Sequence, residues 1–433
     1  MSTPVAIEPT LAGYVDQHRD RLVSIVQDLV RLPSVNHPPG GDEERCQHYV
    51  ASFLTRCGWN PSLYQLRDVP GLADHPLYWP GRDYSARPNL GARLPGASKG
   101  RSLVLSGHVD TVPTGALPWT RSPFSGDVNG NRLYGRGSND MKGGVGTNLF
   151  VVEALRDLGI RLRGDLVFET VVDEEFGGSN GTLAGRLMGF NGDAAIISEP
   201  SFLRVCAAQR GGRVAHITLN AGASGGVLTD RDFPTGILNP LRHFLNFVAE
   251  FTGKRRESAP AHPMYAHLSD PVPVALTKIT TGPWGNNEPQ AIPESCQIEM
   301  YWQTMPGETQ EDIEREFFDW LKLVQTDLPA ALKVEFPIRW LPGSAIDRNE
   351  PVVRELAACA TNILGAAPAV AGIEGPCDLY VFHQVARMPA VLWGARGGNT
   401  HNADEYLEID SVVDAAKVLL TFICRWCGVA RDR

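Results

Sequence analysis

The chain has 433 residues, of which 43% are hydrophobic and 21% are charged, and its formal net charge at pH 7 is −9. This length exceeds the roughly 250–300 residues at which a single hydrophobic core stops growing, so we expect two domains. The composition is that of an ordinary globular protein, and the acidic balance, without a basic stripe, argues against a nucleic-acid partner.

The sequence shows no signal for export or for membrane insertion. Its first sixteen residues are polar and acidic and contain no apolar core of a signal peptide. No apolar run approaches the roughly 20 residues that a membrane span needs. We therefore expect a cytoplasmic protein with no membrane partner. In that reducing compartment the eight cysteines are expected to be free, and the close pair at 424 and 427 is interpreted as buried thiols.

The first half of the chain alternates helical and strand-like patterns. Apolar residues at helical spacing predict helices at 11–32, 43–57 and 142–158. Strands are predicted at 89–94, 102–106, 165–172 and 193–197. The last two are continuous apolar runs, typical of parallel strands buried on both faces. Residues 69–84 are rich in proline, glycine and aromatics and are predicted to be a loop. This alternation indicates a doubly wound α/β fold with a mostly parallel sheet.

After residue 211 the pattern changes to strands in which polar and apolar residues alternate. Strands are predicted at 213–220, 272–279, 295–303 and 333–338, with helices at 239–251 and 309–324. The first pattern then returns with a helix at 349–364, a strand at 390–393 and a helix at 412–424. We therefore predict a main domain formed by residues 1–210 and 339–433, interrupted by an α+β insertion at 211–338.

Polar side chains suited to metal binding follow the predicted buried strands or lie in glycine-rich and polar loops. In chain order they are His108, Asp110, Asp140, Glu174, Glu175, Glu199 and His401. Ligands of open α/β sheets bind at the carboxyl ends of the strands, so we expect these loops to meet there.

The two imidazoles with three of these five carboxylates would suit Zn²⁺, Mn²⁺ or Co²⁺. A pair of such ions about 3.5–4 Å apart can share one carboxylate and activate a water molecule. One spare carboxylate is then needed to take the proton of that water. The tandem Glu174 and Glu175 supply a base and a ligand side by side.

Three motifs, taken together, are highly specific for one group of enzymes. They are Ser-Gly-His-Val-Asp-Thr-Val-Pro at 106–113, Gly-Arg-Gly-Ser-Asn-Asp-Met-Lys-Gly-Gly at 135–144, and Asp-Glu-Glu-Phe-Gly-Gly at 173–178. With them the chain resembles the co-catalytic metallohydrolases of the M20 type. These include acetylornithine deacetylase, succinyl-diaminopimelate desuccinylase, aminoacylase and carboxypeptidase G. The resemblance covers nearly the whole chain. It implies a small-molecule hydrolase whose insertion is a lid that forms a homodimer or a higher homo-oligomer.

The resemblance also implies roles for the polar residues. One or two ions would be held by five ligands: His108, Asp140, Glu175, Glu199 and His401. Asp140 would bridge the two ions, with His108 and Glu199 on one side and Glu175 and His401 on the other. Asp110 would orient the ring of His108, and Glu174 would be the general base.

One departure from the family pattern lies in the lid. Relatives carry a histidine after the first lid strand that polarises the scissile carbonyl in the partner subunit, and here Ser224 occupies its position. A donor aimed at a developing oxyanion is worth about 3–4 kcal/mol, and a serine hydroxyl is a weaker donor than an imidazole. Asn287 or the neighbouring Asn286 is a candidate replacement.

A second departure follows Asp378. Relatives often carry an arginine two residues later that grips a carboxylate of the substrate, and here Tyr380 stands at that position. We expect Asp378 and Tyr380 to contact the substrate, with Arg396 or Arg210 holding its carboxylate.

The expected reaction is hydrolysis of a C–N bond in a small carboxylate-bearing substrate, either an N-acyl amino acid or a dipeptide-like amide. Activated water, after losing a proton to Glu174, attacks the carbon, and Glu174 passes the proton to the departing amine. The missing lid histidine leaves an alternative open, an aminohydrolase that displaces an amine from an activated aromatic ring, as nitroanthranilate aminohydrolase does. A further alternative is a non-catalytic binding protein, against which the retention of Glu174 and all five ligands argues.

Overall fold

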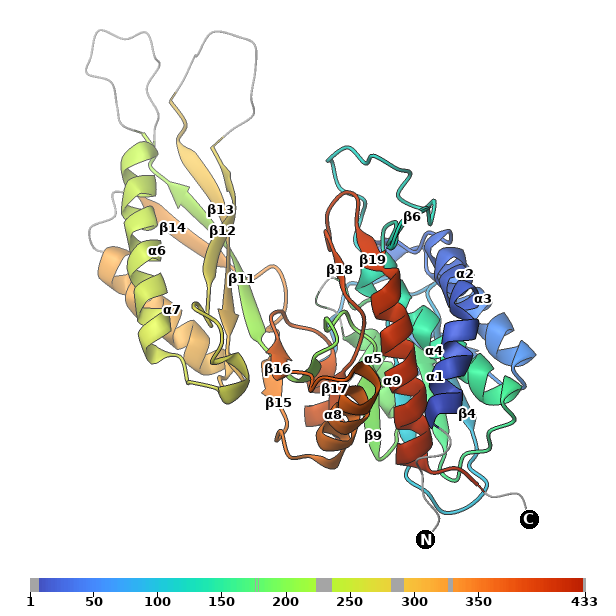
Figure 1. Ribbon diagram of the computed structural model, residues 1–433. Coiled ribbons are helices and arrows are strands. Elements are labelled where there is room, and N and C mark those ends of the chain that lie inside the picture. Colours follow the sequence, from blue (N-terminus) through green and yellow to red (C-terminus); the bar gives the residue numbers. More distant parts are fainter. Residues whose placement is uncertain are drawn as a thin grey trace, which may run out of the picture. The chain divides into compact units, whose positions relative to one another are not determined.

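The computed structural model describes residues 8–175, 177, 179–222, 236–281, 292–325 and 330–430. The chain forms two compact units (Figure 1). Unit 1 consists of Met1–Ala208, Ala345–Ile373 and Cys377–Arg433, and unit 2 of Gln209–Ser344 and Glu374–Pro376. The predicted insertion at 211–338 leaves out the short segment at 374–376.

Unit 1 is built on a nine-stranded sheet of order β15-β10-β17-β9-β5-β8-β4-β3, with β16 paired to β10. The strands are β3 (Ser62–Tyr64), β4 (Asn89–Leu94), β5 (Leu103–Ser106), β8 (Leu166–Thr170), β9 (Ala194–Ile197), β10 (Val205–Gln209), β15 (Ser344–Ala345), β16 (Val370–Ile373) and β17 (Ala390–Leu392). The four central strands β17, β9, β5 and β8 are parallel to one another and buried along their whole length. The predicted α/β class with a mostly parallel sheet is therefore confirmed.

Helices pack on both faces of this sheet. They are α1 (Glu8–Gln17), α2 (Arg19–Val30), α3 (Glu44–Arg56), α4 (Gly143–Asp157), α5 (Asn180–Leu187), α8 (Pro351–Leu364) and α9 (Ile409–Cys427). Helix α9 contacts α1, α4, α8 and β5, whereas α5 contacts the short helix η5 (Val381–Val385). Val104, Val167 and Ala195 of the central strands share a core cluster with Phe382 of η5.

Two helices differ from their predictions. The predicted helix at 11–32 is divided at His18, whose ring stacks on Tyr14 and whose Nδ1 lies 2.8 Å from the Tyr14 carbonyl oxygen. Helix α5 was not predicted, because its eight residues include two glycines and carry no long apolar stripe. Within the part of the chain that the structure describes, no helix is long and apolar enough to cross a bilayer.

Unit 2 is an α+β unit. Its antiparallel sheet has the order β12-β13-β11-β14. Its elements are β11 (Gly211–Asn220), α6 (Leu238–Ser258), β12 (Val274–Thr280), β13 (Ser295–Thr304), α7 (Gln310–Gln325) and β14 (Ala331–Glu335). The alternation in β11 places Ala215, Ile217 and Leu219 in the core. Phe251 of α6, Trp302 of β13 and Phe317 of α7 pack ring against ring there.

Gly144 allows helix α4 to pack closely against Ser198, the residue that follows β9. A Cβ atom at Gly144 would lie 1.9 Å from the carbonyl oxygen of Ser198, the residue before Glu199. This oxygen belongs to the backbone of a buried strand end, so it has little freedom to move away.

We predict that Gly144→Ala lowers the free energy of unfolding by about 1–3 kcal/mol, the usual cost of overpacking a core. Gly13→Ala is the control, because Gly13 lies within α1 and has no atom within 4 Å of its added Cβ. That change should be neutral or stabilise by up to about 1 kcal/mol. Urea denaturation measures both, and equal stabilities of the two variants would contradict the tight contact.

Candidate metal centre

Three neighbouring strand ends carry the candidate residues of unit 1. His108 follows β5, Glu174 and Glu175 follow β8, and Glu199 follows β9. Main-chain hydrogen bonds extend the pairing beyond the strands: Val171 N–H donates to Gly107 O and Val109 N–H donates to Val171 O, both at 3.0 Å. The carboxyl ends of parallel strands meet at one sheet edge, as the sequence analysis expected.

The Asp140 loop is held by a buried glutamate. Glu405 accepts main-chain N–H groups from Gly137, Asn139 and Asp140 at 2.9–3.0 Å, and it pairs with Arg136. Glu405 is fully buried, and its contacts hold the loop in place.

The five predicted ligands come together in two groups that share Asp140. In the first, His108 Nε2 lies 3.2 Å from Asp140 Oδ1 and 3.5 Å from Glu199 Oε1. In the second, His401 Nε2 lies 3.3 Å from Asp140 Oδ2 and 2.9 Å from Glu175 Oε2. The ligand atoms of each group lie within 4.8 Å of one another. Asp140 thus presents one oxygen to each group.

The environment of these groups fits divalent cations. Glu175 Oε1 is buried and has no hydrogen-bond partner, although a buried carboxylate oxygen normally has one. Burial, together with the charge of Asp140, raises the pKa of Glu175 to about 7 and that of Glu199 well above its usual value. Burial would lower the pKa of His401, but its contacts with Asp140 and Glu175 raise it to about 11.

So much buried negative charge is costly unless cations compensate it. Without metal, protons on the two imidazoles supply part of the compensation. A donor set of imidazole and carboxylate groups matches Zn²⁺, Mn²⁺ and Co²⁺, and the unpaired Glu175 oxygen gives such an ion a ligand.

Asp110 was predicted to orient the ring of His108. Nδ1 of that ring lies 2.9 Å from the main-chain oxygen of Asp110 and 3.6 Å from its carboxylate. The carboxylate also accepts the main-chain N–H groups of Glu174 at 3.3 Å and Glu175 at 3.1 Å, and the side-chain amide of Asn36 at 2.8 Å. Burial opposes its ionisation, but His108 and Asn36 hold its pKa at about 2.

Glu174 lies beside the first group, with Oε2 at 3.9 Å from His108 Nε2. Burial raises its pKa well above the usual value, and the charges of Asp378 and Glu199 add to this effect. It lines a small cavity of about 10 Å³. The other residues of this cavity are Ser106, Gly107, His108, Met141, Val171, Thr182, Ile197, Glu199, Asp378 and Phe382.

Asp378 and Tyr380, both predicted to contact the substrate, have different surroundings. Asp378 lines the cavity beside Glu174, and its carboxylate accepts the hydroxyl of Thr182. Tyr380 is only 1% exposed and shares a hydrogen bond with Ser179 Oγ, so its hydroxyl is engaged inside the fold.

The structure does not bring Arg396 to the candidate ligands. Arg396 is exposed, its main-chain N–H donates to Ser411 Oγ of α9, and its charge acts on Asp414. Arg210 belongs to unit 2, where its guanidinium donates to the main-chain oxygens of Pro271 and Glu374. Ser224 and Asn287 lie outside the described residues.

A model of peptidase family M20/M25/M40 matches residues 104–425. The chain belongs to this family. It is 26% identical to N-formyl-4-amino-5-aminomethyl-2-methylpyrimidine deformylase of Halalkalibacterium halodurans, over 97% of this chain and 98% of that protein. It is also 26% identical to acetylornithine deacetylase of Salmonella typhimurium, over 94% of this chain and 97% of that protein.

Among solved structures, human carnosine dipeptidase 1 shares the fold with a TM-score of 0.74 at 16% identity, over 98% of this chain and 100% of that chain. The M20 chain described here is therefore a metal-dependent amidohydrolase, a hydrolase of C–N bonds.

We predict that Glu405→Gln weakens divalent-metal binding by roughly 10- to 100-fold, the usual effect of losing a partner that orients a ligand. The amide is nearly isosteric, but it loses the charge that accepts three N–H groups and pairs with Arg136. Glu408→Gln on β19 (Tyr406–Glu408) is the control, because Glu408 makes none of these contacts. Isothermal titration with Mn²⁺ measures both, and equal affinities would show that Glu405 does not fix the Asp140 loop.

Proposed function

We propose that this M20 enzyme hydrolyses the amide of a small N-acylated substrate, with Glu174 as the proton carrier and a metal pair that shares Asp140. The observation that supports this most is the arrangement of carboxylates. Asp140 faces both ligand groups, whereas Glu174 belongs to neither and lies beside His108. The carboxylate of Glu174 therefore remains available to accept and donate a proton.

The chemistry divides between the ions and the chain. Divalent cations held by these residues polarise a carbonyl group and lower the pKa of an attacking water. Glu174 accepts the proton of that water at a carboxylate oxygen and then donates it to the departing nitrogen. The burial of Glu174, which raises its pKa, favours a carboxylate that binds this proton during the reaction.

The cavity beside Glu174 supports a short acyl group. Its volume of about 10 Å³ is roughly the room that one water molecule needs. A formyl group is the acyl group nearest to this size, an acetyl group would need small shifts of the lining side chains, and a longer chain would have to displace buried side chains such as Met141 or Phe382. The names of two relatives, a deformylase and a deacetylase, agree with this size.

A panel of compounds can identify the amine portion of the substrate. A substrate carboxylate held by Arg396 stays a prediction, as does a homodimer formed through unit 2. We therefore propose a panel of N-formyl, N-acetyl and N-hexanoyl derivatives of amino acids and of amines without a carboxylate. Dipeptides and aminobenzoates complete it, and each compound is tested with Mn²⁺, Zn²⁺ or Co²⁺.

We expect hydrolysis of formyl or acetyl amides that disappears on exhaustive chelation and returns with metal. Turnover of hexanoyl amides at an equal rate would contradict the short-acyl proposal. Release of ammonia from aminobenzoates, with all amides inert, would instead support the aromatic aminohydrolase.

A pair of adjacent variants separates the base from a ligand. Glu174→Gln should lower kcat by roughly 10²- to 10⁴-fold, the usual contribution of a general base, while the protein still binds metal. Glu175→Gln should weaken metal binding, because Glu175 Oε2 faces His401 in the second group. Metal analysis after gel filtration, combined with kinetics, distinguishes the two. Substantial activity of the Glu174 variant would end the assignment of the base.

A further inference from the structure

We propose that Arg82 and Tyr84 are positioning residues that hold the turn carrying Glu174 and Glu175. This inference rests on the proposed function, in which Glu174 moves the proton. The turn begins at Asp173, a fully buried residue with φ of +70°. Residues other than glycine seldom adopt this left-handed conformation, which persists only where surrounding contacts maintain it.

The side chain of Asp173 is where those contacts converge. Arg82 Nε donates to Asp173 Oδ1 at 2.9 Å, and the guanidinium forms a buried ion pair with the same oxygen. Tyr84 Oη donates to Asp173 Oδ2 at 2.7 Å and accepts the side-chain amide of Asn180 at 2.7 Å. Both carboxylate oxygens are thus held by residues that lie about ninety positions earlier in the sequence.

A second set of contacts connects Arg82 to the other side of the turn. Its guanidinium donates to Asn36 Oδ1 at 2.6 Å. The amide of Asn36 in turn donates to Asp110 Oδ2 at 2.8 Å and to Asp173 Oδ1 at 3.2 Å. Because the Asp110 carboxylate accepts the N–H groups of Glu174 and Glu175, the start of the turn is held through one side chain and two main-chain groups. Arg82 contacts Asp173 directly and Asp110 through Asn36.

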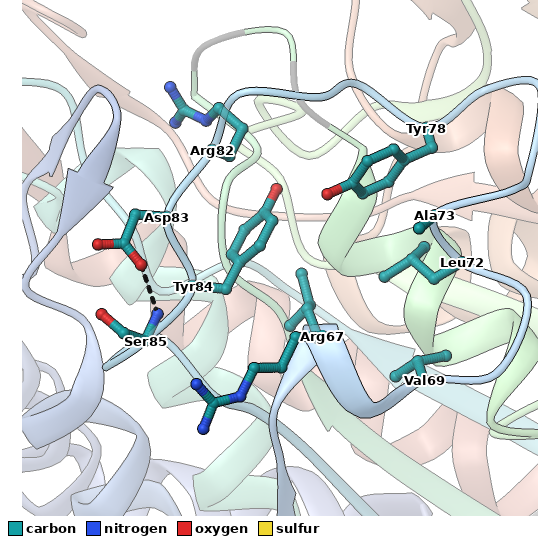
Figure 2. Close-up of a pocket in the computed structure, with 10 residues that line it drawn as sticks. Arg67, Val69, Leu72, Ala73, Tyr78, Arg82, Asp83, Tyr84 and Ser85 are labelled. Carbon is teal, nitrogen blue, oxygen red and sulfur yellow. Dashed lines mark hydrogen bonds between the residues drawn. The ribbon is translucent and has the colours of Figure 1, made fainter.

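Arg82 and Tyr84 also line a cavity of about 240 Å³ (Figure 2). Arg67 and Tyr78 line the same cavity, and the structure records no contact between either residue and Asp173. The chain therefore offers a matched control for each positioning residue. The cavity also gives a small solute room to reach the place that the Arg82 side chain occupies.

The first experiment compares Arg82→Met with Arg67→Met, and Tyr84→Phe with Tyr78→Phe. A displacement of a catalytic group by about 1 Å can cost about 100-fold in rate, so we expect Arg82→Met to lower kcat by roughly 10- to 100-fold with little change in KM. Tyr84→Phe should show a smaller loss, because Arg82 remains. The two controls should retain the wild-type kcat, and equal losses in each pair would overturn the proposal.

The second experiment asks whether a lost guanidinium can be replaced from solution. Millimolar guanidinium should restore activity to Arg82→Ala, whereas methylammonium, which lacks the planar fork, should restore much less. Arg67→Ala should not respond to either. A variant that loses activity merely through a loosened fold would show no such selectivity, and absence of rescue with a normal Tm would count against positioning by Arg82.

A third readout does not depend on turnover. Glu175 is on the same turn, so the visible absorption spectrum of Co²⁺-loaded protein should change in Arg82→Met and in Tyr84→Phe but not in the controls. Should Arg82→Met not fold, Tyr84→Phe keeps the comparison with Tyr78→Phe. Wild-type protein that hydrolyses no amide would refute the proposed function, and the Co²⁺ spectra would still decide the positioning role.

Discussion

One constraint governs the candidate metal centre: several carboxylates are buried within a few ångströms of one another. Asp140, Glu174, Glu175 and Glu199 are enclosed together. Burial and neighbouring negative charge raise the pKa of the three glutamates, whereas, against the effect of burial, contacts with His108 and His401 lower the pKa of Asp140. Two imidazoles offset part of this charge. Divalent cations bound by these residues would offset more of it, because each would carry two charges. The shared position of Asp140 makes the two ligand groups one unit.

The scaffold meets this constraint with rigid parts. Parallel strands buried on both faces bring His108 and Glu199 to one sheet edge, and the turn that carries Glu175 follows the neighbouring strand β8. The remaining ligands come from loops, and loops need added support. Glu405 fixes the Asp140 loop with its carboxylate, and Asp110 fixes the turn after β8. Each supporting carboxylate binds backbone N–H groups, which constrains a loop more firmly than a side-chain contact does.

Sequence patterns were sufficient to predict the strand ends and the polar residues that follow them. A continuous apolar run followed by a polar residue specifies both a buried strand and the sheet edge where its next side chain lies. The insertion could be found because its strands alternate polar and apolar residues, unlike the central ones. Helix α5 escaped prediction because its two glycines and short length leave no clear period.

The supporting residues could not be predicted, since their partners are far away in the sequence. Nothing near Arg82 indicates that it reaches Asp173, and no motif indicates that the Asp110 carboxylate accepts the main-chain N–H groups of Glu174 and Glu175. Tyr380 was expected at the substrate because of its place after Asp378, and its hydrogen bond with Ser179 Oγ could not be inferred from the sequence pattern. Ligands that follow strands can thus be inferred from local pattern, whereas the groups that hold them depend on the tertiary fold.

The central claim is that Asp140 joins two metal sites. Anomalous diffraction from crystals of the Mn²⁺- or Zn²⁺-loaded protein tests it directly. The account predicts two peaks, each about 2.0–2.2 Å from a different oxygen of Asp140, with His108 and Glu199 near one and Glu175 and His401 near the other. Peaks that lie away from the Asp140 carboxylate in fully loaded crystals would contradict it.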